Sequence, residues 1–129
     1  MSAEVHQLQM NHLVLAAGTA EVYDLEWSLP GTWKLTRFAY MPQTNRTANG
    51  TNYTTISMEI AAVEVGTFAL DTVTTDDLTA GTTKNITITG TGTQLEVSPG
   101  TRISFKKTET GTGLALDGTY CTAWEKVRA

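Results

Sequence analysis

The chain contains few of the side chains from which enzymes and metal proteins build their sites. Among 129 residues it has one cysteine, Cys121, and two histidines, His6 and His12. A single cysteine excludes an intrachain disulfide, and the two histidines have no third metal ligand near them in the sequence. Strand alternation places Cys121 beside Ala123 as a small buried side chain. We therefore expect no catalytic centre, no metal and no cofactor.

Charge is also scarce, at 17% of residues, and it is unevenly distributed. The net charge of −4 argues against nucleic acid as a partner, because phosphate binding relies on clustered lysine and arginine. Residues 1–33 contain no lysine or arginine, whereas the segment after residue 101 carries Arg102, Lys106, Lys107, Lys126 and Arg128. Acidic and basic regions of this kind either pair between subunits or form separate solvated faces.

Long apolar runs are missing. The longest, Leu13–Ala17 and Ile60–Val63, are far too short to span a bilayer, so we expect no membrane partner. The first residues lack the basic and apolar regions of a signal peptide, so we expect no secretion. Without secretion, the four Asn-x-Thr sequons are a by-product of abundant threonine; they begin at Asn45, Asn49, Asn52 and Asn85.

What the chain has in excess is threonine, often directly after glycine. Threonine accounts for 25 residues, and ten of the eleven glycines are followed by threonine. Glycine supplies the positive φ that tight turns need, and threonine favours the extended conformation of a strand. Each Gly-Thr pair therefore predicts the end of a turn and the start of a strand, and their spacing predicts a compact all-β domain.

Alternating polar and apolar residues mark the strands. Ala20–Leu29 places Tyr23, Leu25, Trp27 and Leu29 on one face. The turn signal Pro30-Gly31 separates it from Thr32–Met41, so we expect a hairpin. Strict alternation in the second segment places Phe38 and Tyr40 on one face. The opposite face then holds Trp33, Leu35, Arg37, Ala39 and Met41. Eight to nine such short strands predict an antiparallel β-sandwich of jelly-roll type, or a small barrel.

The middle of the chain is divided by its turn signals. Pro42–Asn52 is the most polar stretch, and its Asn49-Gly50 dipeptide is the strongest signal for a type I′ turn. We expect an exposed loop or a long hairpin tip there. Tyr53–Glu64 is predicted to be one strand, and Gly66 to begin the next.

An acidic pair, Asp76-Asp77, lies in the connection Thr74–Gly81. Carboxylates on a turn either cap backbone amides or bind calcium. Capping is favoured, because the D-x-D-x-D spacing of a dedicated calcium loop is missing.

The first residues form a unit of their own in this interpretation. We divide the chain into an N-terminal arm or first strand, residues 1–16, and one β-sandwich domain, residues 17–129. An extended arm with many apolar residues exposes both side chains and backbone amides. We expect these groups to be covered by strand addition to a neighbouring subunit or by docking on a partner. The partner-binding candidates are Val5, Leu8, Met10, Leu13 and Leu15.

Two tryptophans, Trp27 and Trp33, flank the predicted hairpin and would lie close across it. They are a possible ligand platform for stacking on sugars, although aromatic residues on inward strand faces more often belong to the core. Gly31-Thr32-Trp33 also resembles the G-x-W strand signature of lipocalins and avidins, which implies a barrel. In those families the signature lies on the first barrel strand, whereas a well-formed strand precedes it here.

The segment Leu78–Gly113 resembles a module of virion proteins from tailed bacteriophages, namely their jelly-roll decoration (cement) and head-fibre proteins. In that module a Leu-Thr-Ala-Gly turn leads into a short strand. A leucine-x-valine strand, a turn and an isoleucine-bearing strand ending in Gly-x-Gly follow. Thr101 stands where the module usually has aspartate. The matching residues are Leu78, Gly81, Leu95, Val97, Gly100, Ile103, Gly111 and Gly113.

This resemblance implies a structural virion protein, not an enzyme. Such a protein is made in the host cytoplasm and binds the outer surface of the phage head, commonly as a homotrimer. There it bridges subunits of the major capsid protein. The alternative is a carbohydrate- or receptor-binding module of a phage fibre or another surface protein. Solvent exposure of Trp27 and Trp33 distinguishes the two, because a sugar platform must be exposed.

Overall fold

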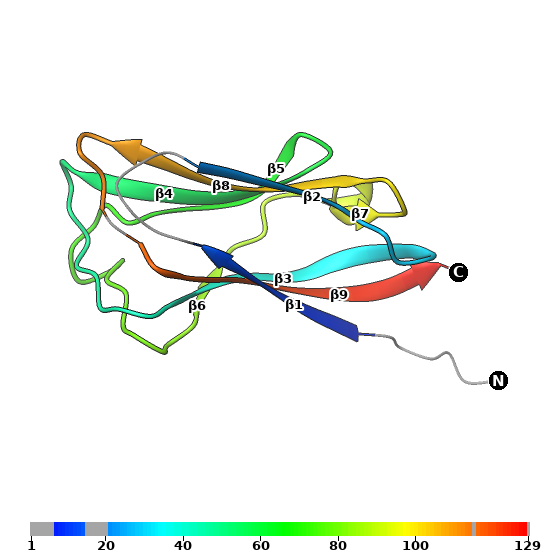
Figure 1. The fold of residues 1–129 in the computed structure, drawn as a ribbon, viewed down its shortest axis with the longest axis horizontal. Helices are drawn as coiled ribbons and strands as arrows, with labels where there is room; N and C mark the ends of the chain where they lie inside the picture. Colours follow the sequence, from blue (N-terminus) through cyan, green and yellow to red (C-terminus); the bar gives the residue numbers. More distant parts are fainter. Residues whose placement is uncertain (1–6, 15–20, 115, 129) are drawn as a thin grey trace.

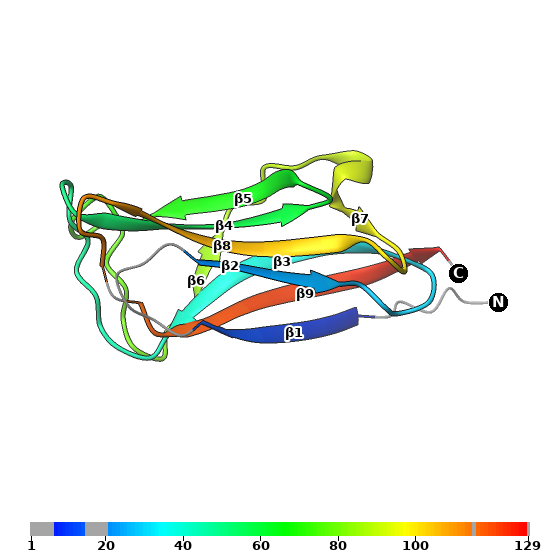
Figure 2. The same ribbon diagram turned by 45° about the horizontal axis from the view of Figure 1, so that its top comes forward.

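The computed structural model describes residues 7–14, 21–114 and 116–128, which form two antiparallel β-sheets packed face to face (Figure 1). The first sheet has the strand order β1-β9-β3-β6, with β7 also paired to β3, and the second has the order β2-β8-β4-β5 (Figure 2). The elements are β1 (Gln7–Val14), β2 (Glu21–Glu26), β3 (Thr32–Pro42), β4 (Tyr53–Ile60), β5 (Val63–Ala69), β6 (Lys84–Ile86), the short 3-10 helix η1 (Gly92–Leu95), β7 (Glu96–Val97), β8 (Arg102–Thr110) and β9 (Gly118–Arg128).

This strand order is that of a jelly roll, in which the chain passes repeatedly from one sheet to the other. Among the described strands, only β4 and β5 are consecutive partners in one sheet. The prediction of an antiparallel, jelly-roll-like β-sandwich is therefore confirmed, and the barrel alternative is not. Residues 7–14, which the sequence assigned to the arm or first strand, form β1 at the edge of the first sheet, where they pair with β9.

The predicted hairpin between Ala20–Leu29 and Thr32–Met41 is wrong. β2 pairs with β8 in one sheet, and β3 pairs with β9 in the other. The Pro30-Gly31 turn instead carries the chain across the end of the sandwich. A backbone hydrogen bond of 2.8 Å from Trp27 N–H to the Thr101 carbonyl continues β2 alongside β8 before the crossing. A turn signal marks where a strand ends, but it does not say which sheet the next strand joins.

The strict alternation predicted for Thr32–Met41 fails at its centre. Trp33 and Leu35 face the core as expected. Phe38 and Tyr40 also face the core, and each of these two side chains is 1% exposed or less. The register with β9 shifts between Leu35 and Arg37, which marks a β-bulge. A bulge inserts one extra residue and reverses the facing of every later side chain.

The segment Tyr53–Glu64 is two strands, not one. A tight turn at Ala61 and Ala62, with φ of 49° and 68°, joins β4 to β5. Both values lie in the left-handed region that a type I′ turn requires, which alanine rarely adopts. Gly66 accordingly lies inside β5 and does not begin a strand.

The Asn49-Gly50 dipeptide forms no type I′ turn, because neither residue has a positive φ. The Asn49 side chain instead organises the loop as an acceptor. Its Oδ1 receives hydrogen bonds from the backbone N–H groups of Thr51, at 2.8 Å, and Asn52, at 2.7 Å. This is the local side-chain-to-backbone bonding for which asparagine is favoured in turns.

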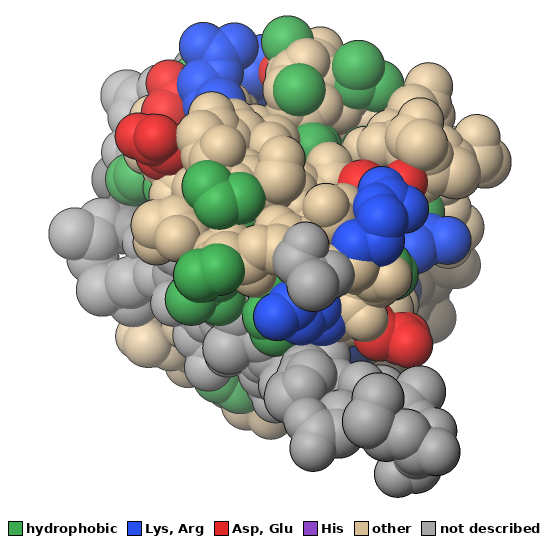
Figure 3. Space-filling view, turned by 90° about the vertical axis from the view of Figure 1, so that its right-hand side faces the viewer, with side chains coloured by type: hydrophobic (Ala, Val, Ile, Leu, Met, Phe, Trp, Pro, Cys, Tyr) green, Lys and Arg blue, Asp and Glu red, His purple; other side chains and the backbone are tan. Residues whose placement is uncertain are grey.

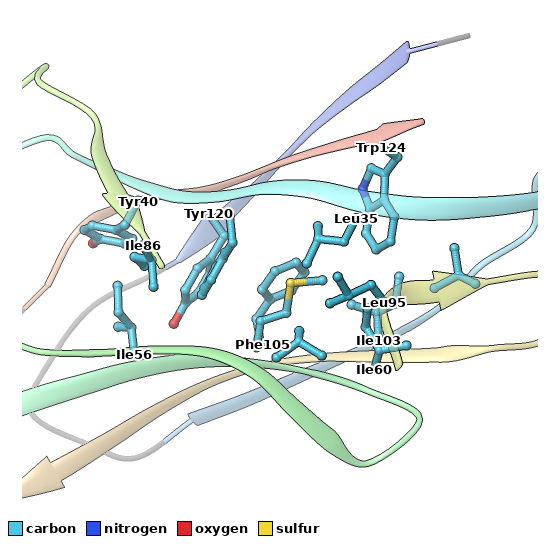
Figure 4. Close-up of a cluster of buried hydrophobic side chains, with 14 of the residues drawn as sticks. Leu35, Tyr40, Ile56, Ile60, Ile86, Leu95, Ile103, Phe105, Tyr120 and Trp124 are labelled. Atoms are coloured by element: carbon cyan, nitrogen blue, oxygen red, sulfur yellow. The ribbon is translucent and has the colours of Figure 1, made fainter. Parts of the chain in front are cut away.

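Aromatic side chains from both sheets fill the core. Figure 4 shows Tyr120 and Trp124 of β9 pointing toward Phe105 and Ile103 of β8. The ring centroids of Phe105 and Tyr120 lie 4.9 Å apart in a stacked arrangement. Cys121, on the same strand, is 5% exposed, as predicted for a small buried side chain.

Candidate interaction surface

The two ends of the sandwich differ in construction (Figure 1). We call one the turn end: it contains the short connections 27–31, 61–62 and 98–101 and the last residues of β9. Backbone hydrogen bonds link these connections, from Trp27 to Thr101 and from Ala61 to Arg102. We call the other the loop end: it contains the long connections 43–52 and 70–83 and the described residues 111–114 and 116–117.

Exposed apolar side chains gather at the turn end. Of five large hydrophobic residues that are exposed in the described structure, three lie there: Leu29 at 38%, Val63 at 42% and Val127 at 41%. Figure 3, which looks onto this end, shows hydrophobic side chains interspersed with lysine and arginine. The Arg128 guanidinium is paired with Glu96, and the Lys126 ammonium lies 5.9 Å from the centre of the Trp33 ring. The end therefore combines exposed apolar side chains with charged groups of both signs.

The loop end is held together by polar side chains. Asp76 and Asp77 each accept a hydrogen bond from a backbone N–H, of Thr72 at 3.0 Å and Ala48 at 2.9 Å respectively, so they cap amides as the sequence favoured. The sequon asparagines are also structural, and their side-chain oxygens bond within the protein: those of Asn45, Asn49, Asn52 and Asn85. Within the described residues there is no group of three histidine, cysteine, aspartate or glutamate side chains able to hold a metal ion.

The possible ligand platform lies in the core. Trp27 is 2% exposed and Trp33 is 9% exposed. Their ring centroids are 6.0 Å apart, and Trp124 packs 4.7 Å from Trp27. The two tryptophans are close, as the sequence suggested, but across the end of the sandwich and not across a hairpin. No exposed indole face is available for a sugar, so this arrangement favours the core interpretation.

The two long sides of the sandwich differ as well. On the side of β5 and β6 the sheets are tied together by a hydrogen bond of 2.8 Å from Thr89 N–H to the Val65 carbonyl and by a bridge between Gly66 and Ile88. We call this the closed side. On the opposite side β1 and β2 are the edge strands, and no backbone hydrogen bond joins them within the part of the chain that the structure describes. We call this the open side.

The predicted partner-binding residues lie partly on the open side. Leu8, Met10 and Leu13 belong to β1, opposite Trp124, Thr122 and Thr119 of β9. Val5 and Leu15 lie outside the described residues. Strand pairing within the chain thus occupies one edge of β1, which the sequence could not reveal because β9 is at the far end of the chain.

Sequence reasoning missed two buried polar groups. Lys107 on β8 is fully buried, with its ammonium 3.7 Å from Glu109 Oε1 and no hydrogen-bond partner. The other Glu109 oxygen accepts a hydrogen bond of 2.5 Å from the Thr54 hydroxyl. The Tyr40 hydroxyl is also buried without a partner. Burial, reinforced by the nearby Asp117 carboxylate, raises the pKa of Tyr40 far above its usual value.

No protein-family model and no curated protein sequence match this chain. Among solved structures, the chain is similar to one of infectious bursal disease virus Gx strain, at 13% identity and a TM-score of 0.44. It is also similar to the crystal structure of the infectious bursal disease virus VP2 subviral particle, at 11% identity and a TM-score of 0.45. Both matches cover 95% of this chain and 32% of the other, so the chain spans about a third of their length. Among the described residues no helix is long and apolar enough to cross a membrane.

Proposed function

We propose that the protein is a decoration (cement) protein that binds the outer surface of a tailed-bacteriophage capsid and bridges subunits of its shell. The observation that carries this proposal is the grouping of exposed apolar side chains at the turn end. Leu29 lies in the connection 27–31, Val63 begins β5 and Val127 lies near the end of β9. Exposed apolar side chains from three separate segments at one end are typical of a contact surface.

The residues of the phage-protein resemblance have clear roles in this fold. Its four aliphatic residues are buried in the core: Leu78, Leu95, Val97 and Ile103. Its four glycines all have positive φ and form turns: Gly81, Gly100, Gly111 and Gly113. The resemblance therefore rests on side chains that determine the fold, and it supports a virion role through a shared fold and not through a shared site.

The turn end suits attachment by burial of surface. Its connections are short and hydrogen-bonded to one another, so docking orders few additional residues. Each large aliphatic side chain buried on binding contributes about 1.5–3 kcal/mol. Several such contacts tethered in one oligomer bind with high avidity.

Co-sedimentation with capsids of the phage that encodes the chain tests this proposal. We expect Leu29→Asp and Val63→Asp to lower the amount of protein bound to capsids at least tenfold, which corresponds to about 1.4 kcal/mol. The matched control is Val73→Asp, because Val73 is 54% exposed but lies at the loop end. It should bind as the unchanged protein does. Equal binding by all three variants, each shown to be folded by circular dichroism, would contradict the proposed contact surface.

A further inference from the structure

The outer edge of β1 differs from the other strand edges in the part of the chain that the structure describes. Its eight residues, QLQMNHLV, include no lysine, arginine, aspartate, glutamate, glycine or proline. The edge strand β2 carries Glu21, Asp24 and Glu26, and on the closed side the sheets are joined through Gly66 and Ile88. Charged residues and covering connections are the usual protection of strand edges against further pairing. β1 has neither among the described residues.

The open side also leaves the core incompletely covered. Tyr23 and Leu25 of β2 point inward and pack against the core, yet both are only partly buried, whereas Phe105 and Ile103, their partners on β8, are each 1% exposed. A molecule that extends the first sheet beyond β1 would lie alongside these two side chains. The uncharged backbone edge and the partly covered apolar residues thus lie on the same side of the sandwich.

We infer that β1 pairs antiparallel with β1 of a second copy of this chain, which joins two sandwiches about a two-fold axis. A row of free backbone N–H and C=O groups is satisfied by another extended strand. In a solution of the protein alone, β1 of another copy supplies one. Because β1 is uncharged, self-pairing brings no like charges together.

The register of β1 is compatible with this pairing. Leu8, Met10 and His12 lie opposite Trp124, Thr122 and Tyr120, which are core-facing positions of β9. A two-fold axis through Met10 or Asn11 pairs even-numbered positions of β1 with even-numbered positions of its copy. Residues opposite each other in an antiparallel pair share a face, so the joined sheet keeps one core face throughout.

Sedimentation equilibrium of the full chain tests the inference without capsids, so its outcome is independent of the proposed function. At concentrations from about 1 μM to about 1 mM the mass should rise from 13.9 kDa to twice that value. Gln7→Lys with Gln9→Lys should keep the protein monomeric by placing lysines on the pairing edge. Thr67→Lys with Thr87→Lys is the matched control, because both threonines are exposed on the closed side, and this variant should still double its mass.

Hydrogen exchange of the unchanged protein supplies a second measurement. Amides of residues 7–14 should exchange more slowly as the concentration rises, while amides of β5 should not change. A monomer throughout, a trimer, or a dimer that both lysine variants form equally would overturn the inference. Concentration-dependent protection confined to another element would overturn it as well. This measurement uses the unchanged protein, so it does not depend on whether the β1 variant folds.

Discussion

Gly66 lies inside β5, where a side chain would collide with the core. A Cβ atom built on Gly66 would lie 2.7 Å from Cδ2 of Phe38, a ring that is 1% exposed. We expect Gly66→Ala to lower the free energy of unfolding by about 1–3 kcal/mol, because Phe38 must leave its rotamer or β5 must shift. Urea denaturation measures the loss. Gly50→Ala is the control: its Cβ would meet its nearest atom at 3.6 Å, and it should change stability by less than about 1 kcal/mol.

Tyr40 links stability to alkaline pH. Its hydroxyl is buried without a partner, and burial together with Asp117 raises the pKa of Tyr40 in the folded protein, against a smaller opposite effect of Arg46. A pKa raised by folding means that the unfolded chain loses this proton first. The stability that Tyr40 contributes is therefore complete below about pH 10 and is lost as the pH rises above that value.

Tyr40→Phe isolates this effect. It removes a hydroxyl that makes no hydrogen bond, so at pH 7 we expect the free energy of unfolding to change by less than about 1 kcal/mol. Above about pH 10 the variant should lose stability less steeply than the unchanged protein. Denaturant titrations at a series of pH values measure both slopes. Parallel slopes would show that Tyr40 ionises as readily in the folded state as in the unfolded one.

Residue-level prediction from the sequence succeeded for apolar positions and failed for buried polar ones. Strand alternation predicted that Cys121 is a small buried side chain, and it is 5% exposed. Lys107 was counted among the basic residues near the C-terminus, yet it is fully buried beside Glu109. Composition treats every lysine as a surface charge. The alternation of β8, which turns Ile103 and Phe105 inward, also turns Lys107 inward, because Lys107 lies two residues after Phe105.

Among the elements, the turn between β4 and β5 is the least expected from its sequence. Ala61 and Ala62 both adopt positive φ without the side chains that favour it. We expect Ala61→Asn with Ala62→Gly to raise the free energy of unfolding by about 1 kcal/mol, since asparagine and glycine adopt the type I′ conformation with less strain. Urea midpoints measure the gain. Ala69→Gly, in the extended part of β5, should instead lower stability, and a gain in that variant as well would argue against relief of turn strain.

Most of the strands were predictable, because alternation and Gly-Thr punctuation are local signals. The bulge near Thr36 was missed because strict alternation was applied to Thr32–Met41, although its large apolar residues change from odd positions (Trp33, Leu35) to even ones (Phe38, Tyr40). In the structure the Thr36 hydroxyl donates a hydrogen bond to the Ala123 carbonyl on β9. The Pro30-Gly31 crossing was missed because the choice of sheet depends on strands far away in the chain.

For the whole molecule, composition and turn spacing were enough to predict an all-β sandwich, but not its surfaces. The N-terminal and C-terminal strands β1 and β9 pair with each other, so the first described residues are part of the sandwich. A deletion of residues 2–12 would therefore remove most of β1 and uncover β9. Point substitutions on β1 are the more specific test of its role.

The two ends of the molecule should respond differently to added peptide. Gly81 lies in the exposed connection 70–83 at the loop end, and a Cβ atom placed on it would meet nothing within 4 Å. A short epitope inserted between Gly81 and Thr82 should therefore leave capsid binding unchanged and remain accessible to an antibody on decorated capsids.

Arg128, the last described residue, lies at the turn end (Figure 1). The same epitope appended after residue 129 should lower binding at least tenfold, because it would intrude between the turn end and the shell. Immunogold labelling and co-sedimentation measure the two effects. Strong binding by the C-terminal fusion, with loss of binding by the loop insertion, would show that the sandwich attaches through its loop end.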